Sequence, residues 1–298
     1  MRAAVYSQTG DPAQVLSVTE IGEPHAGPGG IRIAVRAAGV NPIDWKLVTG
    51  MAGGPPDGPK VPGIDAAGVV DEVGEGVTGV AVGDAVFGKA QGSAAEFAVL
   101  TDWARIPDSV SFDVAGGVPV AGETAVRVLD LLGLRAGQTV VVDGASGGVG
   151  SVTVQLAVSR GLRVIGTAGP ANQGFVRSLG ALPTTHGPGL ADRVRALAPD
   201  GVDGGVDTAG KGSVHDLVDL TGNPATVVTI ADFGAGALGV QVTTGGGEQG
   251  PRLAQIADLL AAGGLQVPIA GTYPLDRIAE AYAESRAGHV VGKLVLRP

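Results

Sequence analysis

The first third of the chain carries short apolar runs separated by glycine, proline and aspartate. They include IRIAVRAAGV (31–40), AAGVVDEVG (66–74) and AAEFAVL (94–100). Runs of this length with turn residues at both ends are typical of β-strands. Residues 1 to about 117 are therefore expected to form a region of strands joined by turns.

Between residue 118 and about residue 264, strand-like runs alternate with helical segments. TVVVDG (139–144) precedes the helical stretch SVTVQLAVSRG (151–161), and RVIGTAG (163–169) precedes FVRSLGA (175–181). Later strand-like runs are GGVDTAG (204–210) and ATVVTIADFG (225–234). Such alternation predicts right-handed βαβ units around a parallel sheet, which places the chain in the α/β class.

The tail, PLDRIAEAYAESRAGHVVGKLVL (274–296), has the pattern of an amphipathic helix followed by a last strand. At 298 residues the chain exceeds a typical single domain. We expect two domains, one formed by residues 1–117 and completed by residues 265–298, the other by residues 118–264. The segment GGPPDGPK (53–60) is the clearest surface loop.

Composition narrows the location and the partners. Hydrophobic residues make up 44% of the sequence but aromatic residues only 3%, so the core has to be built from Val, Leu, Ala and Ile. The formal net charge of -9 disfavours nucleic acids and anionic membrane surfaces as main partners. No apolar run is long enough to cross a bilayer, and the N-terminal MRAAVYSQTG lacks a signal-peptide core. We expect a cytoplasmic location.

The sequence has no cysteine, which excludes disulfides, thiol nucleophiles and thiolate metal sites. Its histidines are scattered at positions 25, 186, 215 and 289 and do not have the spacing of metal ligands. We therefore predict that the chain has no metal site.

The most informative local motif is TVVVDGASGGVGSVTVQLA (139–157), a β-branched run, a glycine-rich turn and a helical pattern. Ala145-x-Gly147-x-x-Gly150 matches the dinucleotide fingerprint with alanine at its first position. Gly147 lets the backbone approach a pyrophosphate, Gly150 lets the helix pack close to its strand, and the helix N-terminus offers N–H groups to the phosphates. The expected cofactor contacts here are Ala145, Ser146, Gly147, Gly148, Val149 and Gly150. The alternative is a glycine-rich turn without a ligand.

Cofactor choice is expected at the end of the next strand, where NAD enzymes usually carry an acidic residue for the ribose 2′-hydroxyl. Here the sequence is GTAGP (166–170), which contains no acid. Its absence permits the 2′-phosphate of NADPH, with Thr167, Ala168, Asn172 and His186 as candidate contacts. Because no Arg or Lys follows the strand directly, a neutral loop with weak selectivity is the alternative.

Taken from end to end, the chain resembles the medium-chain dehydrogenase/reductase superfamily, specifically its zinc-free quinone oxidoreductase and enone (2-alkenal) oxidoreductase branch. The motifs that carry the resemblance are MRAAVYSQTG, AGVNPIDWKLVTG, VPGIDAAGVVDEVGEGVTGVAVGDAVFG, GSAAEFAVL, PVAGETAVRVL, GQTVVVDGASGGVG, GVDGGVDTAG and GHVVGKLVL. The resemblance implies a GroES-like β-barrel domain from the first and last segments, with a Rossmann domain inserted between them. It also implies an active site in the cleft and a homodimer formed through an edge strand at residues 239–243.

Zinc-dependent alcohol dehydrogenases of this superfamily carry a ligand cysteine where this chain has NPID (41–44), and a histidine–glutamate pair where it has GID (63–65). Their four-cysteine structural loop has no counterpart here. Without a Lewis acid an alcohol's hydride is hard to release, because nothing stabilises the alkoxide. Conjugate reduction is easier since the acceptor's own carbonyl spreads the charge, which favours enone or quinone reduction over alcohol oxidation.

The segment NPIDWK (41–46) matches the family's Asn-Pro-x-Asp motif, which lines the nicotinamide end of the cleft. By this resemblance Asn41 and Asp44 are candidate catalytic residues, with Asn41 bonding the substrate carbonyl or the ribose. Lys46 could donate to a developing enolate oxygen. Asp65 corresponds to a family aspartate near the same cleft. The alternative is a simple turn with Asp44 and Lys46 as a surface pair and Asp65 supporting the turn before it.

The same resemblance implies contacts with the nicotinamide and the 2′-phosphate. Thr124 opens a helix that the family aims at the nicotinamide, so its hydroxyl is expected to bond the carboxamide; a helix cap is the alternative. Phe233 follows a strand and is expected to cover the ring, with a simple core position as the alternative. His186 stands where relatives often have a tyrosine beside the 2′-phosphate, or is a solvated loop residue.

We predict NADPH-dependent transfer of hydride to the β-carbon of an α,β-unsaturated carbonyl or to a quinone, with the protein supplying placement, donors and a dry cleft. No tyrosine lies in the 41–46 motif, so water or Lys46 is expected to supply the proton. One alternative is an NADPH-binding sensor or scaffold with little turnover. Another is an alcohol dehydrogenase, which the missing metal ligands disfavour.

Overall fold

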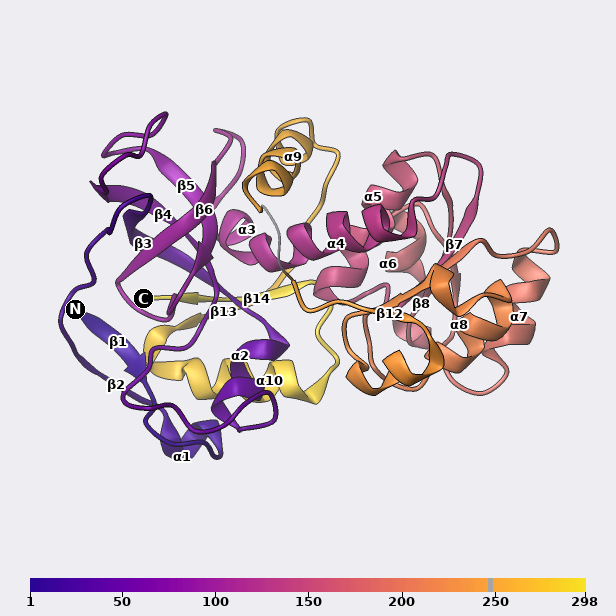
Figure 1. Ribbon diagram of the computed structural model, residues 1–298, viewed down its shortest axis with the longest axis horizontal. Helices are drawn as coiled ribbons and strands as arrows, with labels where there is room; N and C mark the ends of the chain where they lie inside the picture. The colour runs from indigo at the N-terminus through magenta and orange to yellow at the C-terminus, as the bar shows by residue number, and fades with distance from the viewer. Residues whose placement is uncertain (246–248) are drawn as a thin grey trace. The chain divides into compact units, whose positions relative to one another are not determined.

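The computed structural model describes residues 1–245 and 249–298, which form two compact units (Figure 1). The first contains Met1–Val120, the helix α9 (Gly250–Ala261) and Val267–Pro298, and the second begins at Ala121. The sequence assigns α9 to the parallel-sheet region, but this helix packs against β6 (Phe97–Arg105) of the first unit. The domain limits expected at residues 117 and 264 stay a prediction.

The first unit is built on β3 (Ile31–Val40), β4 (Asp65–Val73), β5 (Ala85–Ala90) and β6, each antiparallel to the next. Because β6 also pairs with β3, these strands close into a barrel. The last strand, β14 (Lys293–Arg297), pairs antiparallel with β3 and so extends the same sheet. The other elements are β1 (Arg2–Val5), β2 (Ser17–Glu20), β13 (Ile269–Pro274), α1 (Pro12–Val15), α2 (Pro42–Val48), α3 (Phe112–Gly117), η4 (Leu275–Arg277) and α10 (Ile278–Ala287).

The burial of β3 follows its sequence pattern. Ile31, Ile33 and Val35 are buried, whereas Arg32 is only partly buried and Arg36 is exposed, as expected for a strand with one covered face. From residue 37 to residue 40 every side chain is buried, because β14 and α3 both pack against this half. The functional residues that follow β3 therefore emerge from a fully covered strand end.

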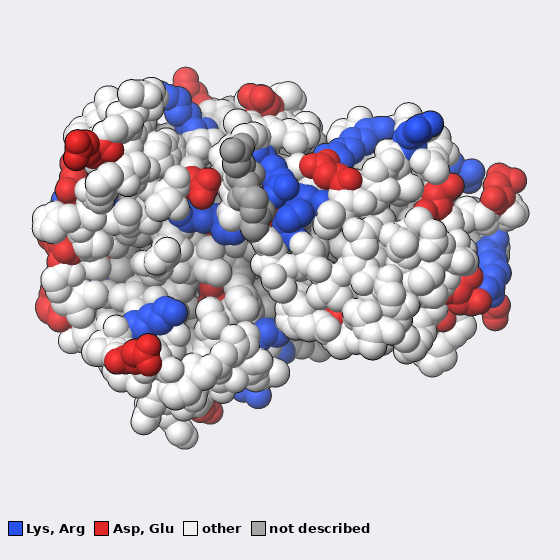
Figure 2. All heavy atoms as spheres, viewed as in Figure 1, with Lys and Arg blue, Asp and Glu red and all other residues white. Residues whose placement is uncertain are grey.

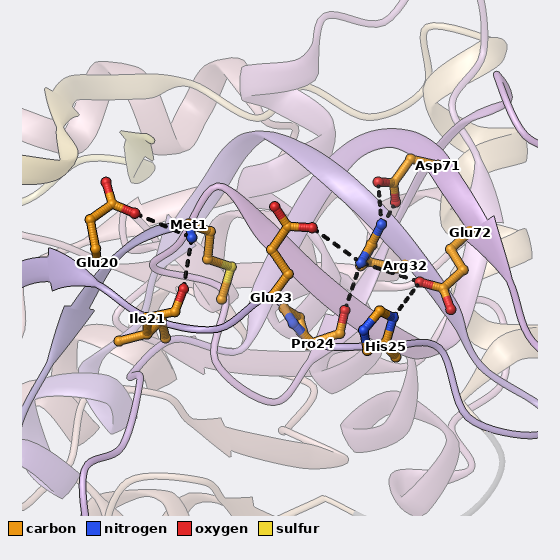
Figure 3. A network of polar contacts seen from close by, with 9 residues as sticks. All are labelled: Met1, Glu20, Ile21, Glu23, Pro24, His25, Arg32, Asp71 and Glu72. Carbon is orange, nitrogen blue, oxygen red and sulfur yellow. Dashed lines mark hydrogen bonds and ion pairs between the residues drawn. The ribbon is translucent and has the colours of Figure 1, made fainter.

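An arginine ties the N-terminal segment to the barrel (Figure 3). Arg32 donates twice to Asp71, from Nε at 3.1 Å and from Nη2 at 2.9 Å, and once to the Pro24 carbonyl at 2.9 Å. Glu23 and Glu72 also lie within ion-pair distance of its guanidinium. These carboxylates raise the pKa of Arg32, with the Asp71 hydrogen bonds as the largest cause. The network anchors a segment that has little secondary structure of its own.

The second unit is a parallel sheet in the order β9-β8-β7-β10-β11-β12. The order reverses direction between β7 (Thr139–Asp143) and β10 (Gly204–Asp207), the place where doubly wound folds bind ligands. Its other elements are α4 (Pro119–Leu132), α5 (Gly148–Ser159), β8 (Arg163–Thr167), η1 (Pro170–Asn172), α6 (Gln173–Ser178), β9 (Leu182–Thr184), α7 (Leu190–Leu197), α8 (Val214–Thr221), η2 (Pro224–Thr226), β11 (Val227–Thr229), η3 (Phe233–Leu238) and β12 (Gln241–Val242).

Small aliphatic residues make the core of this unit. Val141 and Ile165 of the sheet pack with Leu190 and Val194 of α7 and with Leu217 of α8.

On the face shown in Figure 2, uncharged residues cover most of the surface, and Lys and Arg are interspersed with Asp and Glu. Within residues 1–245 and 249–298, no helix has the length and apolar character needed to cross a membrane.

Gly68 of β4 offers a test of the barrel packing. A Cβ on Gly68 would lie 2.1 Å from the carbonyl oxygen of Ala34 in β3. We expect Gly68→Ala to lower the free energy of unfolding by about 2 kcal/mol or more, because the strands have to separate to relieve the overlap. Trp45 and Trp103 are the chain's two tryptophans, and both lie in the first unit. Their fluorescence during denaturation therefore reports the change in the free energy of unfolding.

Gly22→Ala is the matched control, since nothing lies within 4 Å of a Cβ built there. A Gly68→Ala protein as stable as the Gly22→Ala protein would contradict the close approach of the two strands.

Candidate functional site

Asn41 stands at the start of α2, and its side chain is used by the protein itself. Asn41 Nδ2 donates to Asp65 Oδ2 at 2.9 Å, and Asn41 Oδ1 accepts from Lys293 Nζ at 2.6 Å. The Asn41 N–H donates to Asp44 Oδ2 at 2.8 Å, while the Asp44 N–H donates to the Asn41 carbonyl at 3.0 Å. Asp44 is only 1% exposed, so the alternative of a surface pair with Lys46 is wrong.

Lys293 holds this cluster from the other end of the chain. Besides Asn41, its Nζ donates to the Val40 carbonyl at 3.1 Å and lies 3.8 Å from Asp65 Oδ2. The other oxygen of Asp65 accepts the Val120 N–H at 2.8 Å. Asn41, Asp65 and Lys293 are all buried. Since removing one partner of a buried ion pair leaves an uncompensated charge, these groups stabilise one another only as a set.

Two buried carboxyls and one ammonium leave this cluster with an excess of acid. Burial raises the pKa of Asp44 from 3.8 to about 7, and the neighbouring Asp65 adds to the rise, while the Asn41 N–H and Lys293 oppose it. Burial also raises the pKa of Asp65 and lowers that of Lys293, and the attraction between the two opposes both shifts. Asp44 Oδ1 has no hydrogen-bond partner within the described part of the chain. Asp44 is therefore the member that readily carries a proton near neutral pH.

Lys46 lies outside this network. Its Nζ is 5.8 Å from the centre of the Trp45 ring, and the residue is partly exposed. The structure thus brings together three of the four predicted catalytic residues and leaves Lys46 apart from them. The ammonium inside the buried cluster is that of Lys293, so the ammonium of Lys46 remains available to another group.

Two tyrosines that are distant in the sequence lie near Asp44. Burial raises the pKa of Tyr6 and, more strongly, that of Tyr282, and the Asp44 carboxylate adds to both shifts. The Tyr282 hydroxyl is buried, and no described residue bonds it. Tyr6 also lines a pocket of about 410 Å³ together with Leu47 and residues 54–60. The loop expected at residues 53–60 therefore borders a cavity of the first unit.

The glycine turn of the second unit joins β7 to α5, as the sequence predicts. Gly144 has a φ of +78°, a conformation that favours glycine. A Cβ on Gly150 would lie 2.1 Å from the Gly144 carbonyl oxygen, so the helix can approach its strand only because residue 150 lacks a side chain. Residues 146–149 are partly exposed, and the first N–H groups of α5 have no partner within the helix. These features fit the phosphates of a dinucleotide.

Asp143 and Thr167 support this turn from beneath. The Thr167 hydroxyl donates to the Asp143 carboxylate and accepts the Gly144 N–H at 3.1 Å. Ser213 Oγ donates to the other oxygen of Asp143 at 2.7 Å, and the buried Ala145 donates its N–H to the Thr167 carbonyl at 2.9 Å. The sequence suggests Thr167 as a contact of the 2′-phosphate. In the structure Thr167 is fully buried, and its hydroxyl holds the turn and is not free to donate to a phosphate.

The loop after β8 is tied to the end of β9 by Gln173. Its Nε2 donates to the carbonyls of Ala168, Gly169 and Thr184, at 2.8, 3.2 and 3.1 Å. Ala168 is buried, so its side chain faces the protein, whereas Asn172 at the end of η1 is partly exposed. Of these predicted contacts, Asn172 is the side chain that is open to solvent.

His186 is exposed in a loop that Arg193 organises. The Arg193 guanidinium donates to the carbonyls of Thr185, His186, Gly187 and Pro188, at distances between 2.7 and 3.3 Å. Carbonyl oxygens are neutral partners, so they do not cancel the positive charge of Arg193. This loop therefore places a cation beside the exposed histidine.

The two predicted nicotinamide contacts differ in exposure. Thr124 is buried in α4, and its Oγ1 accepts a hydrogen bond from Arg127 Nη2 at 3.2 Å. Phe233 begins η3 and is 53% exposed, so the alternative of a simple core position is wrong. All the predicted cofactor contacts lie in the second unit, and all the predicted catalytic residues lie in the first.

The fold and these motifs match known proteins. Residues 27–104 match the family model of the alcohol dehydrogenase GroES-like domain, and residues 188–296 match that of a zinc-binding dehydrogenase. A chloroplast envelope quinone oxidoreductase homolog from Arabidopsis thaliana is 30% identical over 333 residues, covering 100% of this chain and 98% of that protein. The chain belongs to the quinone oxidoreductase branch of the medium-chain dehydrogenase/reductase superfamily. The expected fold class, a GroES-like barrel with a Rossmann sheet, is confirmed.

Two further matches bear on function. A mycobacterial structure complexed with NADPH has a TM-score of 0.89 and 29% identity, with 100% of both chains covered. The erythronolide synthase EryA2 of Saccharopolyspora erythraea is 36% identical over 286 residues, which is 90% of this chain. This chain covers only 8%, 7% and 3% of the length of three polyketide synthases to which it is similar.

One matched family is described as zinc-binding, so the groups that could hold a metal ion in this chain bear on its chemistry. Among the residues that the structure describes, no group of three or more His, Cys, Asp or Glu side chains could hold a metal ion. Asp44 and Asp65 lie together, but Asp65 faces the side-chain NH2 group of Asn41 and the ammonium of Lys293, and neither group has a lone pair to offer a cation.

Sequence reasoning missed the residues that hold the site from a distance. Lys293 is the lone charge in the apolar strand GKLVL, and Arg127 is the lone charge between apolar residues in TAVRVL. Each position signals a buried partner, because an unpaired charge is not tolerated in a core. The signal does not say which partner. Gln173 and Arg193, which hold two loops, have no comparable signal in the sequence. Both donate to backbone carbonyls, which every residue provides.

The raised pKa of Asp44 predicts a pH-dependent stability. Its folded pKa of about 7 lies above the ordinary 3.8, so its contribution to stability is complete below about pH 4 and is lost as the pH rises through about 7. Asp44→Asn keeps an acceptor for the Asn41 N–H and has no proton to lose. From about pH 4 to about pH 8 we expect the natural protein to lose roughly 4 kcal/mol of unfolding free energy relative to this variant.

Denaturation followed by tryptophan fluorescence at several pH values measures this difference. Parallel pH profiles for the two proteins would show that the Asp44 pKa is not raised in the folded state.

Proposed function

We propose that this chain is an NADPH-dependent oxidoreductase that transfers hydride to an α,β-unsaturated carbonyl or to a quinone. The observation that carries the proposal is the turn from Gly144 to Gly150. Its residues 146–149 are partly exposed, and its helix approaches the preceding strand without a side chain between them. The similarity to a mycobacterial protein complexed with NADPH supports the same cofactor.

In this proposal the second unit binds the cofactor. The N–H groups at the start of α5, with Ser146, Gly147, Gly148 and Val149, would hold the pyrophosphate. Thr124 would bond the carboxamide, and the exposed Phe233 would cover the nicotinamide ring. When bound, NADPH supplies the hydride.

The preference for NADPH over NADH rests on the loop after β8 and on the loop of His186. Residues 166–170 contain no acid that would repel a 2′-phosphate. Asn172 and His186 are open to solvent, and Arg193 contributes a positive charge at the base of the His186 loop. A histidine and a nearby guanidinium suit an anion, whereas an NAD enzyme would place a carboxylate in this region.

The first unit would stabilise the oxygen of the acceptor. Lys46 is partly exposed and can donate to an oxygen on which negative charge develops. Asn41, Asp44, Asp65 and Lys293 are occupied with one another, so in the proposal they fix the start of α2 and thereby the position of Lys46. The proton that completes the reduction would come from Lys46 or from water.

The reaction is proposed to proceed without zinc. The sequence offers no cysteine, and the residues in place of zinc ligands are committed to a buried network with Lys293. An acceptor that delocalises charge through its own carbonyl has no need of a Lewis acid. This chemistry favours enones and quinones over simple alcohols.

We further propose a cytoplasmic homodimer that pairs through the strand at residues 239–243.

The direct test is NADPH oxidation in the presence of an enone panel and a quinone panel. We expect turnover with at least one class, and weaker binding of NADH than of NADPH. Binding of NADPH without turnover of either class would instead support a nucleotide-binding sensor or scaffold. No binding of either nucleotide would overturn the proposal as a whole.

Gly150→Ala tests the cofactor seat. Its Cβ would lie 2.1 Å from the Gly144 carbonyl oxygen, so the turn has to open and its N–H groups lose their alignment. We expect affinity for NADPH to fall by at least about tenfold, since each lost charge-assisted hydrogen bond costs about 1.5 kcal/mol or more. Fluorescence titration with NADPH measures the affinity. Gly174→Ala is the control, because nothing lies within 4 Å of its Cβ; equal affinities would argue against this turn as the seat.

Lys46→Met tests the proposed donor to the acceptor. We expect kcat to fall by roughly 100- to 1,000-fold, as for the loss of one oxyanion donor, while the affinity for NADPH stays the same. Lys46→Arg keeps a donor and should restore part of the rate. Steady-state kinetics with the best acceptor of the two panels gives both values. A Lys46→Met enzyme with the natural kcat would remove Lys46 from the mechanism.

A further inference from the structure

Arg127 is an almost completely buried arginine in the middle of α4, and three acceptors hold its side chain. Nε donates to Glu123 Oε1 at 3.1 Å, Nη2 donates to Thr124 Oγ1 at 3.2 Å, and Nη1 donates to Thr243 Oγ1. Arg127 is 7% exposed and Glu123 only 1%. The pair with Glu123 balances the charge, so the guanidinium is fixed in one orientation on the helix.

This arrangement determines what the Thr124 hydroxyl can do. A hydroxyl has one proton to donate and can accept through its lone pairs, whereas a guanidinium only donates. Thr124 Oγ1 is therefore the acceptor toward Arg127, and its own proton remains for another group. Within residues 1–245 and 249–298, the Thr124 hydroxyl donates no hydrogen bond.

Other helical threonines of the same unit use their protons differently. Thr153 donates to the Val149 carbonyl at 2.9 Å, and Thr221 donates to the Leu217 carbonyl at 3.0 Å, each four residues earlier in the helix. This local bond is the usual fate of a threonine inside a helix. Thr124 departs from this pattern: its oxygen accepts from Arg127, three residues later in the helix, and its proton goes to no carbonyl of the preceding turn. The departure leaves a buried donor without an acceptor.

We propose that Arg127 is a positioning residue that fixes Thr124 as a hydrogen-bond donor to the carboxamide oxygen of the nicotinamide. The inference rests on the proposed function, because it takes NADPH as the ligand. Arg127 acts through Thr124 and does not touch the cofactor. By holding the hydroxyl oxygen still, it sets the direction of the donated proton, and thereby the orientation of the carboxamide and of the ring.

A double-mutant cycle on kcat with saturating NADPH tests this coupling. Arg127→Lys keeps the charge opposite Glu123, but a single ammonium cannot bond three partners in the geometry of a guanidinium. We expect Arg127→Lys and Thr124→Val each to lower kcat by about fivefold, the equivalent of one hydrogen bond. In the Thr124→Val background, Arg127→Lys should add less than about a twofold effect, because its route is already removed. The acceptor KM should change little in all three proteins.

Multiplication of the two effects in the double variant would overturn the inference, since Arg127 would then act independently of Thr124. Glu123→Gln combined with Arg127→Met removes both charges together and provides a second route to the same cycle if Arg127→Lys folds poorly. Its effect should also vanish in the Thr124→Val background. Arg160→Met is the control. Arg160 Nη1 lies 2.8 Å from Asp130 Oδ1 of α4 and makes no contact with Thr124, so this variant should keep the natural kcat.

The outcome is separable from that of the proposed function. If the natural protein neither binds nor oxidises NADPH, the proposed function has failed before the cycle begins. If it oxidises NADPH and the cycle is multiplicative, only the role of Arg127 is wrong.

Discussion

A buried polar group needs a partner, and in this chain the partners come from distant positions. Lys293 bonds Asn41 across 252 residues, Arg127 bonds Thr243 across 116, and Ser213 bonds Asp143 across 70. The rest of the core is almost entirely Val, Leu, Ala and Ile. The three long-range bonds secure the start of α2 in the first unit, and the glycine turn and α4 in the second. Each of them therefore supports a segment that carries residues proposed to act.

Local patterns predicted a large part of this structure. The β-branched run before Asp143, the glycines after it and the apolar helix that follows are all short-range features, and β7, the turn and α5 form where they predict. The same holds for β3, whose alternation of buried and exposed residues is visible in the sequence. The parallel sheet followed from the alternation of strands and helices, because a strand that connects to a parallel neighbour requires a crossover.

Long-range pairing was beyond the reach of these patterns. Thr167 looks like a ligand contact in the sequence because it ends a strand beside the glycine turn, but its hydroxyl is drawn under the turn by Asp143. Asn41 looks like a free amide, yet Lys293 and Asp65 occupy both its ends. Likewise, α9 follows the last strand of the parallel sheet in sequence but packs against the barrel. In each case the deciding partner lies far away along the chain, and no local spacing indicates it.

The parts of the proposed cofactor seat differ in how freely they can change. Gly150 has no space for even one methyl group, and Asp143 and Thr167 brace the backbone beneath it. Gly169, in contrast, has a φ of -61° and nothing within 4 Å of an added Cβ. If the loop after β8 sets the preference between the two nicotinamide cofactors, as proposed, that preference can be redesigned at Gly169 without a steric clash with the scaffold.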